Sequence, residues 1–375
     1  MDKKLRVVIS GGGTGGHIFP AVSIANAIRE KHPDAEILFV GAEGRMEMKR
    51  VPQAGYKIVA LPIVGFNRSN LLKNFMLPYK MWKSDRIVKG VLKEFKPMAA
   101  VGVGGYVSYP TLKAAASEGI PCVIQEQNSF AGKANKMLAK NKKTRRICVA
   151  YEGMERFFPS EKLMLTGNPV RQALLECKTS RDEAVSTFGL SPEHPVVLII
   201  GGSLGARTMN ESVLAHLDAI QTSDVQFVWQ TGSCYHASIR QRLEEQGCPD
   251  NLKVMDFISD MGVAYRAADL VISRAGASSI SELCLLGKPS ILVPSPNVAE
   301  DHQTHNAMAL VNRGAAMIVR DVEAQETLIP LAVKTLGDPE KAYQQLGVNA
   351  RKMALPDSAN IIADEVIRLA QGEGR

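Results

Sequence analysis

The chain has 375 residues, of which 45% are hydrophobic and 22% are charged. This length exceeds what one hydrophobic core usually organises, and the composition excludes a disordered, a collagen-like or a disulfide-stapled protein. Charge is divided unevenly, because residues 1–166 carry a net charge of +14 and residues 167–375 a net charge of −7. We therefore expect the first half to face an anionic partner, which could be a nucleic acid, a phosphorylated substrate or an anionic membrane.

Short apolar runs bounded by Gly or Pro alternate with longer amphipathic segments along the chain. Few of these runs alternate apolar with polar residues, which favours buried parallel strands joined by helical crossovers. In the first half the predicted strands are 5–10, 36–41, 57–62, 98–103, 121–125 and 145–150. In the second half they are 195–201, 225–231, 252–257, 269–273, 289–294 and 315–320.

This order of elements predicts an α/β fold of two doubly wound, Rossmann-like domains whose parallel sheets face a cleft. The boundary is expected near Thr166–Pro169, giving an N-terminal domain over 1–166 and a C-terminal domain over 167–354. The tail contains no convincing strand, and a helix over about 355–372 is expected to pack back on the N-terminal domain. The six cysteines are scattered without a CxxC pair, which predicts free thiols in a reducing cytoplasm and no zinc site. The first residues show no secretory signal peptide.

The first predicted strand runs into a glycine-rich turn and a helix over 7–21, VVISGGGTGGHIFPA. Its glycines match the G-x-G-x-x-G fingerprint of dinucleotide sites. However, the acidic residue that should end the second strand is replaced by Gly41-Ala42. The interpretations left open by the turn itself are an anion site at a helix N-terminus, a nicotinamide site and a tight turn without a ligand.

His17 lies in the first turn of that predicted helix, where the helix macrodipole favours a neutral imidazole that can accept a proton. A second glycine turn, GVGGYVSYP over 102–110, follows another strand of the same domain. It contains Gly104, Gly105 and Tyr106. Two such turns on a positively charged domain can cradle a diphosphate between them.

The second half carries two further motifs after predicted strands. In SRAGASSISE over 273–282, small residues let a phosphate approach the backbone, and Glu282 can bind vicinal ribose hydroxyls. The pair Ser279 and Glu282 also reads as a helix-capping box, and the sequence does not decide between the two. The segment PSPNVAEDHQTHNA over 294–307 has no metal-ligand spacing, so no metal site is predicted, and Gln303 is expected to bind sugar hydroxyls.

Seven motifs occur in order along the whole chain: GGGTGGH (11–17), GGYVS (104–108), QEQN (125–128), GNPVR (167–171), GGSLGA (201–206), SRAGASSISE (273–282) and DHQTHNA (301–307). In this combination the chain closely resembles the MurG family of peptidoglycan N-acetylglucosaminyltransferases, which belongs to glycosyltransferase family 28. The resemblance implies the two-domain GT-B architecture and no cofactor. It implies that the C-terminal domain binds most of UDP-N-acetylglucosamine (UDP-GlcNAc) and that the N-terminal domain binds the lipid acceptor.

The resemblance also implies roles for residues at matching positions of this sequence. Those expected near the donor sugar nucleotide are Thr14, Gly15, Gly16, Asn128, Arg171, Ser203, Ile258, Ala277, Ser278, Ser279, Glu282 and Gln303. Those expected near the acceptor diphosphate are Gly104, Gly105 and Tyr106. The chain departs from the family pattern at Leu204 and His302, where many relatives have glutamine.

The implied reaction moves GlcNAc from UDP to the C4 hydroxyl of the MurNAc residue of lipid I, giving lipid II for peptidoglycan synthesis at the cytoplasmic face of the inner membrane. An α-linked donor and a β-linked product require inversion, and hence one in-line displacement. Arg171 and helix N-termini would offset the charge of the departing UDP. His17 is the expected general base, and Glu126 is the second choice.

Three other functions share some of these features. A UDP-sugar epimerase of the same fold would need no lipid acceptor, and a nicotinamide oxidoreductase is disfavoured by the missing ribose acid. A nucleic-acid-binding module would explain the positive charge. It is disfavoured because the aromatic content is only 6% and no recognised nucleic-acid motif occurs.

The segment 66–96 holds eight basic residues against Asp85 and Glu94. Its apolar side chains recur at spacings of three or four, which places them along one helical face, and Pro78 is expected to kink or divide that helix. These side chains are Leu72, Phe75, Met76, Tyr79 and Trp82. The segment 133–146 adds seven basic residues and no acid. The two segments predict reversible binding to an anionic membrane surface, whereas the alternative is an apolar stripe that faces the core.

Overall fold

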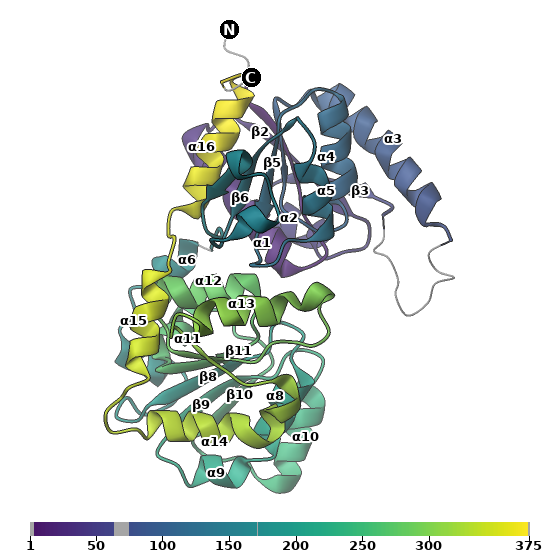
Figure 1. The fold of residues 1–375 in the computed structure, drawn as a ribbon. Helices are drawn as coiled ribbons and strands as arrows, with labels where there is room; N and C mark the ends of the chain where they lie inside the picture. Colours follow the sequence, from purple (N-terminus) through teal and green to yellow (C-terminus); the bar gives the residue numbers. More distant parts are fainter. Residues whose placement is uncertain (1–3, 64–74, 171, 374–375) are drawn as a thin grey trace. The chain divides into compact units, whose positions relative to one another are not determined.

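The structure is a computed structural model, and it describes residues 4–63, 75–170 and 172–373. It divides into two compact units, one formed by Met1–Arg171 with Leu355–Arg375 and the other by Gln172–Ala354. Each unit holds one parallel β-sheet with helices on both faces (Figure 1). The predicted α/β class with two doubly wound domains is therefore confirmed.

The sheet of the first unit has seven strands in the order β3-β2-β1-β4-β5-β6-β7. The strands are β1 (Arg6–Ser10), β2 (Glu36–Ala42), β3 (Lys57–Leu61), β4 (Ala99–Gly102), β5 (Cys122–Glu126), β6 (Thr144–Val149) and β7 (Leu163–Leu165). Successive residues of β1 enter different cores, because Val7 and Ile9 pack in one hydrophobic cluster and Val8 in another. Burial on both faces explains why the strands read as continuous apolar runs. The edge strand β7 was not predicted, because its apolar run is only three residues long and is not fully buried.

The helices of the first unit are α1 (Gly15–Lys31), α2 (Glu47–Gln53), α3 (Leu77–Phe95), α4 (Ser108–Ser117), α5 (Lys133–Ala139) and α16 (Ser358–Ala370), with short 3-10 turns η2 (Met154–Arg156) and η3 (Ser160–Lys162). The expectation that Pro78 kinks or divides a helix is wrong. Pro78 lies in the first turn of α3, where a missing backbone N–H costs nothing because that group has no partner within the helix.

Helix α16 returns the end of the chain to the first unit. It packs beside α1, and its Ile362 and Val366 are fully buried in the same cluster as Val7 and Ile9. Two ion pairs flank this contact, one between Lys31 and Asp364 and one between Arg146 and Glu365. The last helix is therefore part of the core of the first unit.

The sheet of the second unit has six strands in the order β10-β9-β8-β11-β12-β13. The strands are β8 (Val196–Ile200), β9 (Gln226–Gln230), β10 (Leu252–Met255), β11 (Leu270–Ser273), β12 (Ser290–Leu292) and β13 (Met317–Ile318). The helices are α6 (Gln172–Leu175), α7 (Arg181–Thr187), α8 (Arg207–Leu214), α9 (Leu217–Gln221), α10 (His236–Gln246), α11 (Met261–Ala267), α12 (Ala277–Leu286), α13 (His302–Val311), α14 (Ala324–Leu336) and α15 (Gln344–Lys352), with 3-10 turns η4 (Ala299–Asp301) and η5 (Asp321–Glu323). Among the described residues, no helix is both long enough and apolar enough to cross a membrane.

Candidate active site

The candidate residues of the first unit lie at the carboxyl ends of three adjacent strands. Strand β1 ends at Ser10, β4 at Gly102 and β5 at Glu126, and these strands are neighbours in the sheet. The carboxyl ends of parallel strands meet at one edge, which is where open α/β sheets bind their ligands. The two glycine turns and the segment after β5 therefore share this edge.

The two glycine turns pack directly on each other. A Cβ atom on Gly105 would overlap the carbonyl oxygen of Gly12, and one on Gly104 would lie 2.6 Å from Cδ2 of His17. Both Gly104 (φ +102°) and Gly105 (φ +81°) also have backbone angles that favour glycine. The buried Ser108 hydroxyl donates to the carbonyl oxygens of Ser10 and Gly104, at 2.8 and 2.7 Å, and so joins this turn to the end of β1.

His17 is the third residue of α1, and its ring is held by the turn that precedes it. Nδ1 lies 3.1 Å from the carbonyl oxygen of Gly12 and 3.2 Å from the hydroxyl of Thr14. A carbonyl oxygen can only accept a hydrogen bond, so Nδ1 carries the proton of a neutral ring and Nε2 is the basic nitrogen. A Cβ on Gly104 would lie 2.8 Å from Nε2, so this nitrogen faces the second glycine turn.

Glu126 is buried, and its carboxylate is surrounded by donors from the loop after β5 and from α5. It accepts hydrogen bonds from Gly132 N at 3.0 Å, Asn135 Nδ2 at 2.9 Å and Asn128 N at 3.2 Å. Burial raises the pKa of this carboxyl group, and the hydrogen bonds oppose that rise. The contacts hold the segment from β5 to α5 together, so the Glu126 carboxylate is engaged by its own surroundings.

Around these groups, Thr14 is exposed, Gly15, Gly16 and Asn128 are half-buried, and Tyr106 is 62% exposed. Gly15 and Gly16 are the first two residues of α1, so their N–H groups have no carbonyl partner within the helix. Helix N-termini of this kind attract anions.

Sequence reasoning missed one buried group at this edge. Glu47, the first residue of α2, is fully buried, and its carboxylate accepts hydrogen bonds from the backbone N–H groups of Gly13 and Ala42, both at 3.0 Å. It lies 34 residues after Gly13 and outside every motif. The available signal was an acidic residue at the start of a short helix, which is too weak to identify a contact.

In the second unit, the candidate residues again follow the carboxyl ends of strands. Ser203 lies in the exposed turn between β8 and α8, and Ile258 follows β10. Ile258 is buried, and its N–H donates to the side-chain oxygen of Gln230 on β9 at 2.9 Å. The turn before α12 follows β11 and the loop before α13 follows β12, so four of the six strands contribute to this edge.

Helix α12 begins at Ala277, with Gly276 as its N-cap, and no side chain caps it. The capping-box interpretation of Ser279 and Glu282 is therefore wrong, because both residues lie inside the helix. The Ser278 hydroxyl is buried and makes no hydrogen bond to the described residues. Glu282 is 7% exposed and accepts a hydrogen bond from the Tyr265 hydroxyl at 2.9 Å.

Side chains of the segment 294–307 make hydrogen bonds that fix the loop before α13. The side-chain oxygen of Gln303 accepts a hydrogen bond from Ser295 N at 2.8 Å, and the buried Asn306 donates to the carbonyl oxygen of Ala275. Arg274 pairs with Asp321 and donates to carbonyl oxygens just after β12. Arg171 lies outside the described residues, and no group of three or more His, Cys, Asp or Glu among the described residues could hold a metal ion.

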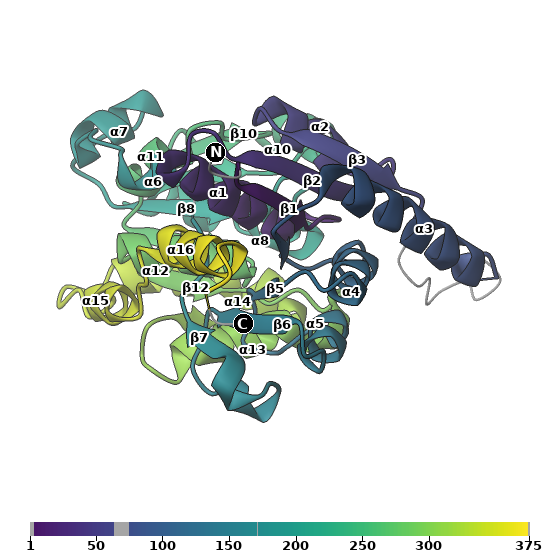
Figure 2. The ribbon, with the colours of Figure 1, turned by 90° about the horizontal axis from the view of Figure 1, so that it is seen from above.

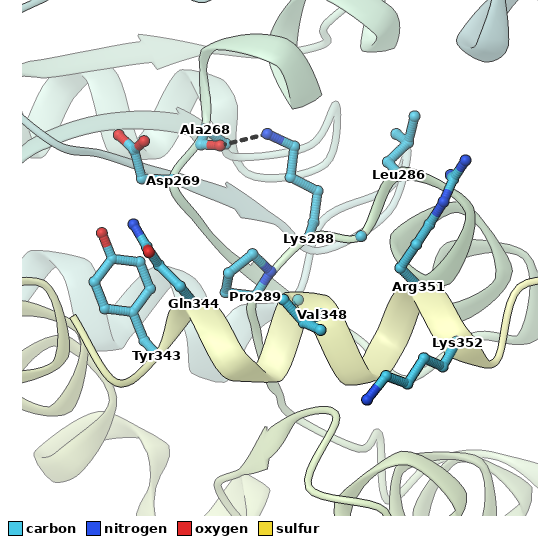
Figure 3. Close-up of a pocket in the computed structure, with 12 residues that line it drawn as sticks. Ala268, Asp269, Leu286, Lys288, Pro289, Tyr343, Gln344, Val348, Arg351 and Lys352 are labelled. Carbon is cyan, nitrogen blue, oxygen red and sulfur yellow. Dashed lines mark hydrogen bonds between the residues drawn. The ribbon is translucent and has the colours of Figure 1, made fainter.

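A pocket of about 630 Å³ lies at the opposite, amino edge of the second sheet (Figure 3). It is lined by Asp269 and Pro289, just before β11 and β12, and by α15. The Lys288 side chain points to the carbonyl oxygen of Ala268, to which it donates at 2.7 Å. Burial lowers the pKa of Lys288 to about 8. This pocket shares no residue with the candidate site.

Two parallel, doubly wound units with glycine-rich turns at their carboxyl edges define the GT-B class of glycosyltransferase folds. The solved structure of Acinetobacter baumannii MurG superposes with a TM-score of 0.75 at 27% identity, covering 97% of this chain and 99% of the other. The calicheamicin glycosyltransferase superposes with a TM-score of 0.73 at 16% identity, covering 99% of each chain, which shows the fold alone.

Sequence comparison narrows the class to a family. The glycosyltransferase family 28 N-terminal domain matches residues 7–145, and the glycosyltransferase family 28 C-terminal domain matches residues 196–361. A Bacteroides fragilis protein is 60% identical over 98% of this chain and 96% of its own length, and it is named UDP-N-acetylglucosamine--N-acetylmuramyl-(pentapeptide) pyrophosphoryl-undecaprenol N-acetylglucosamine transferase. The chain belongs to glycosyltransferase family 28, within the MurG group.

Proposed function

We propose that this protein is an inverting hexosyltransferase that moves GlcNAc from UDP-GlcNAc to the C4 hydroxyl of MurNAc in lipid I, giving lipid II. The observation that carries this proposal is the 60% identity, over nearly the full length of both chains, to the Bacteroides fragilis transferase. Its name states both the donor and the acceptor. A UDP-sugar epimerase of the same fold does not account for that identity.

We assign UDP-GlcNAc to the carboxyl edge of the second sheet. The first turn of α12 offers the backbone N–H groups of Ala277, Ser278 and Ser279 to a phosphate, and the Ser278 hydroxyl lies in the same turn. Glu282 stands one turn further, where a carboxylate can accept hydrogen bonds from ribose hydroxyls. Ser203, Ile258 and Gln303, on neighbouring loops, complete this donor site in the proposal. Arg171 would offset diphosphate charge, and Thr14, Gly15, Gly16 and Asn128 of the first unit would lie near the donor sugar.

We assign the acceptor to the carboxyl edge of the first sheet, where the diphosphate of lipid I would lie on the turn of Gly104, Gly105 and Tyr106. His17 supports this assignment, because its basic Nε2 faces the same turn. In a single displacement, the C4 oxygen attacks the anomeric carbon as the bond to UDP breaks, and the proton of the hydroxyl passes to Nε2 of His17. Amide N–H groups at helix N-termini stabilise the negative charge that develops on UDP.

We further propose that the protein acts at the cytoplasmic face of the inner membrane as a peripheral enzyme. Helix α3 supports this, because both views show it extending from the body of the first unit (Figures 1 and 2). Apolar side chains at and just before its start face outward, with Phe75 88%, Tyr79 52% and Trp82 54% exposed, while its buried face consists of Ser84, Val88 and Leu92. Leu72 and Lys73 of the predicted segment lie outside the described residues.

The proposed reaction is tested by incubating the protein with UDP-GlcNAc and a short-chain lipid I analogue and measuring the release of UDP. We expect UDP and a disaccharide product in equal amounts, and release only when both substrates are present. Conversion of UDP-GlcNAc to another UDP-sugar without acceptor would instead establish an epimerase. If UDP-GlcNAc reacts neither with the acceptor nor without it, both the transferase and the epimerase proposals are contradicted.

A further inference from the structure

The buried carboxylate of Glu47 lies beneath the first glycine turn, and the proposed mechanism does not use it. Its Oε2 accepts the N–H of Gly13, and its Oε1 accepts the N–H of Ala42, the last residue of β2. The side chain is 0% exposed. A buried carboxylate is costly unless its oxygens are hydrogen-bonded, so the two amide donors are a condition for its presence.

Two glycines make room for this side chain. A Cβ on Gly12 would overlap Oε1 of Glu47, and a Cβ on Gly41 would lie 2.7 Å from its Cγ. Real Cβ atoms do not approach other atoms so closely, so neither position accepts a larger residue unless Glu47 moves. The turn and the end of β2 are therefore shaped around the carboxylate.

The chemistry of the two partners specifies a carboxylate. Both are N–H groups, so the side chain must supply two acceptors and no donor. Glutamine has the same length but would turn an NH₂ group toward one of the two backbone N–H groups and leave it unsatisfied in a buried site. Aspartate is one methylene shorter and cannot reach both amides from the same backbone position.

The hydrogen bonds continue from Glu47 to the ring of His17. The Glu47 carboxylate accepts a hydrogen bond from the N–H of Gly13. The carbonyl oxygen of the same peptide unit, from Gly12, lies 3.1 Å from Nδ1 of His17 and accepts its hydrogen bond. Gly12 also lies against Gly105 of the second turn. The peptide unit Gly12–Gly13 therefore connects the Glu47 carboxylate to the imidazole, whose Nδ1 it contacts together with the Thr14 hydroxyl.

We propose that Glu47 is a positioning residue for the transfer reaction, which fixes the Gly12–Gly13 peptide and through it His17. This inference rests on the proposed function, because it assumes that His17 acts in transfer. Glu47 touches no substrate in this proposal. Its loss affects the step that needs an aligned base, whereas in the proposed function most of the contacts to the donor come from the second unit.

The test compares Glu47→Gln with Glu43→Gln, which removes an exposed carboxylate from the adjoining turn. For Glu47→Gln we expect kcat to fall roughly tenfold to a hundredfold, as for a small misplacement of a reacting group, with the KM for UDP-GlcNAc within about threefold of the parent. Amide hydrogen exchange at Gly13 and Ala42 should accelerate in this variant. Glu43→Gln should match the parent in all three measurements.

An unchanged kcat in a folded Glu47→Gln protein with accelerated exchange at Gly13 would overturn the inference. So would a KM for the donor that rises as much as kcat falls. If Glu47→Gln does not fold, Gly12→Ala disturbs the same contact, because its Cβ would meet the Glu47 carboxylate, and the same loss of kcat is expected. An inactive parent enzyme would contradict the proposed function. An active parent whose kcat is unchanged by Glu47→Gln would contradict only the role of Glu47.

Discussion

At the scale of single residues, the ring of His17 is oriented by the protein itself. The carbonyl oxygen of Gly12 fixes the proton on Nδ1, so the basic nitrogen is defined by the backbone of the turn. A general base needs its acceptor nitrogen unprotonated and pointed at the hydroxyl it serves. The Gly12 carbonyl oxygen fixes which nitrogen of a neutral ring accepts the proton, and that nitrogen, Nε2, faces the turn of Gly104.

His17→Ala should therefore lower kcat by about 10²–10⁴-fold, while the KM for UDP-GlcNAc stays nearly constant. Steady-state kinetics with a short-chain acceptor measure both constants. His32→Ala is the matched control, because His32 lies at the other end of the same helix. If His17→Ala loses activity through donor affinity alone, the base is Glu126 or water.

Lys288 gives a second prediction at this scale, which concerns stability and pH. Burial lowers its pKa from 10.5 to about 8 in the folded protein. Between these pH values the unfolded chain binds a proton that the folded chain does not, so the free energy of unfolding rises with pH. The gain is roughly 3 kcal/mol, from about two and a half pKa units.

Urea unfolding of the parent and of Lys288→Met, across pH 8 to 10.5, isolates this contribution. Methionine keeps most of the length of the side chain and does not titrate. As pH rises, the free energy of unfolding of the parent should increase relative to that of Lys288→Met. A difference that stays constant over this range would mean that the Lys288 pKa is not lowered.

At the scale of elements, α16 decides where the C-terminal end of the chain belongs. Its buried residues complete the core beside α1, although more than 300 residues separate the two helices in sequence. Adjacent isoleucines on α16 have opposite environments, because Ile362 is fully buried and Ile361 is 38% exposed. The helix therefore supports the first unit through one face only.

Ile362→Ala should lower the free energy of unfolding by about 2–5 kcal/mol, because it removes buried methyl groups and leaves a cavity. Ile361→Ala removes the same atoms from the exposed face and should cost far less. Equilibrium unfolding in urea compares the two variants. Equal losses would show that α16 does not pack on α1 in solution.

At the scale of the whole molecule, charge and exposed apolar surface coincide on α3. Asp85 is paired with Lys89 at 2.9 Å, and Arg86 stacks 5.1 Å from the centre of the Trp82 ring. Lys80 and Lys83 lie beside Tyr79 and Trp82 on the same helix. Anionic headgroups attract each nearby lysine by about 1 kcal/mol, and the aromatic rings add apolar contact at the interface.

We expect the double variant Lys80→Gln, Lys83→Gln to bind anionic vesicles about tenfold or more weakly at low salt. Turnover of a soluble, short-chain acceptor should not change. Co-sedimentation with vesicles of anionic and of neutral lipid measures the effect, and a double variant of Lys334 and Lys352 in the second unit is the control. If the α3 variant sediments like the parent, this helix is only a solvated surface.

The sequence alone determined the fold class and the glycine-rich turns at which we propose that the chemistry occurs. Alternating apolar runs and amphipathic segments are a local signal, because strands buried on both faces cannot carry many polar residues. The glycine turns are equally local, since the positive φ angles of Gly13, Gly104 and Gly105 favour residues without a Cβ. His17 and the first turn of α12 are therefore recognisable from the order of residues along the chain.

Only the tertiary structure decided the features that join distant residues. The contact of Glu47 with Gly13 spans 34 positions and has no periodicity, so no pattern in the sequence predicts it. The choice between a capping box and a free helix start at α12 depended on whether the helix begins at Ala277 or later. Whether the apolar stripe of α3 faces the core or solvent depended on which helix face packs in the core of the first unit, and that face consists of Ser84, Val88 and Leu92. In each case the outcome depends on packing between segments, which the chain fixes only when it has folded.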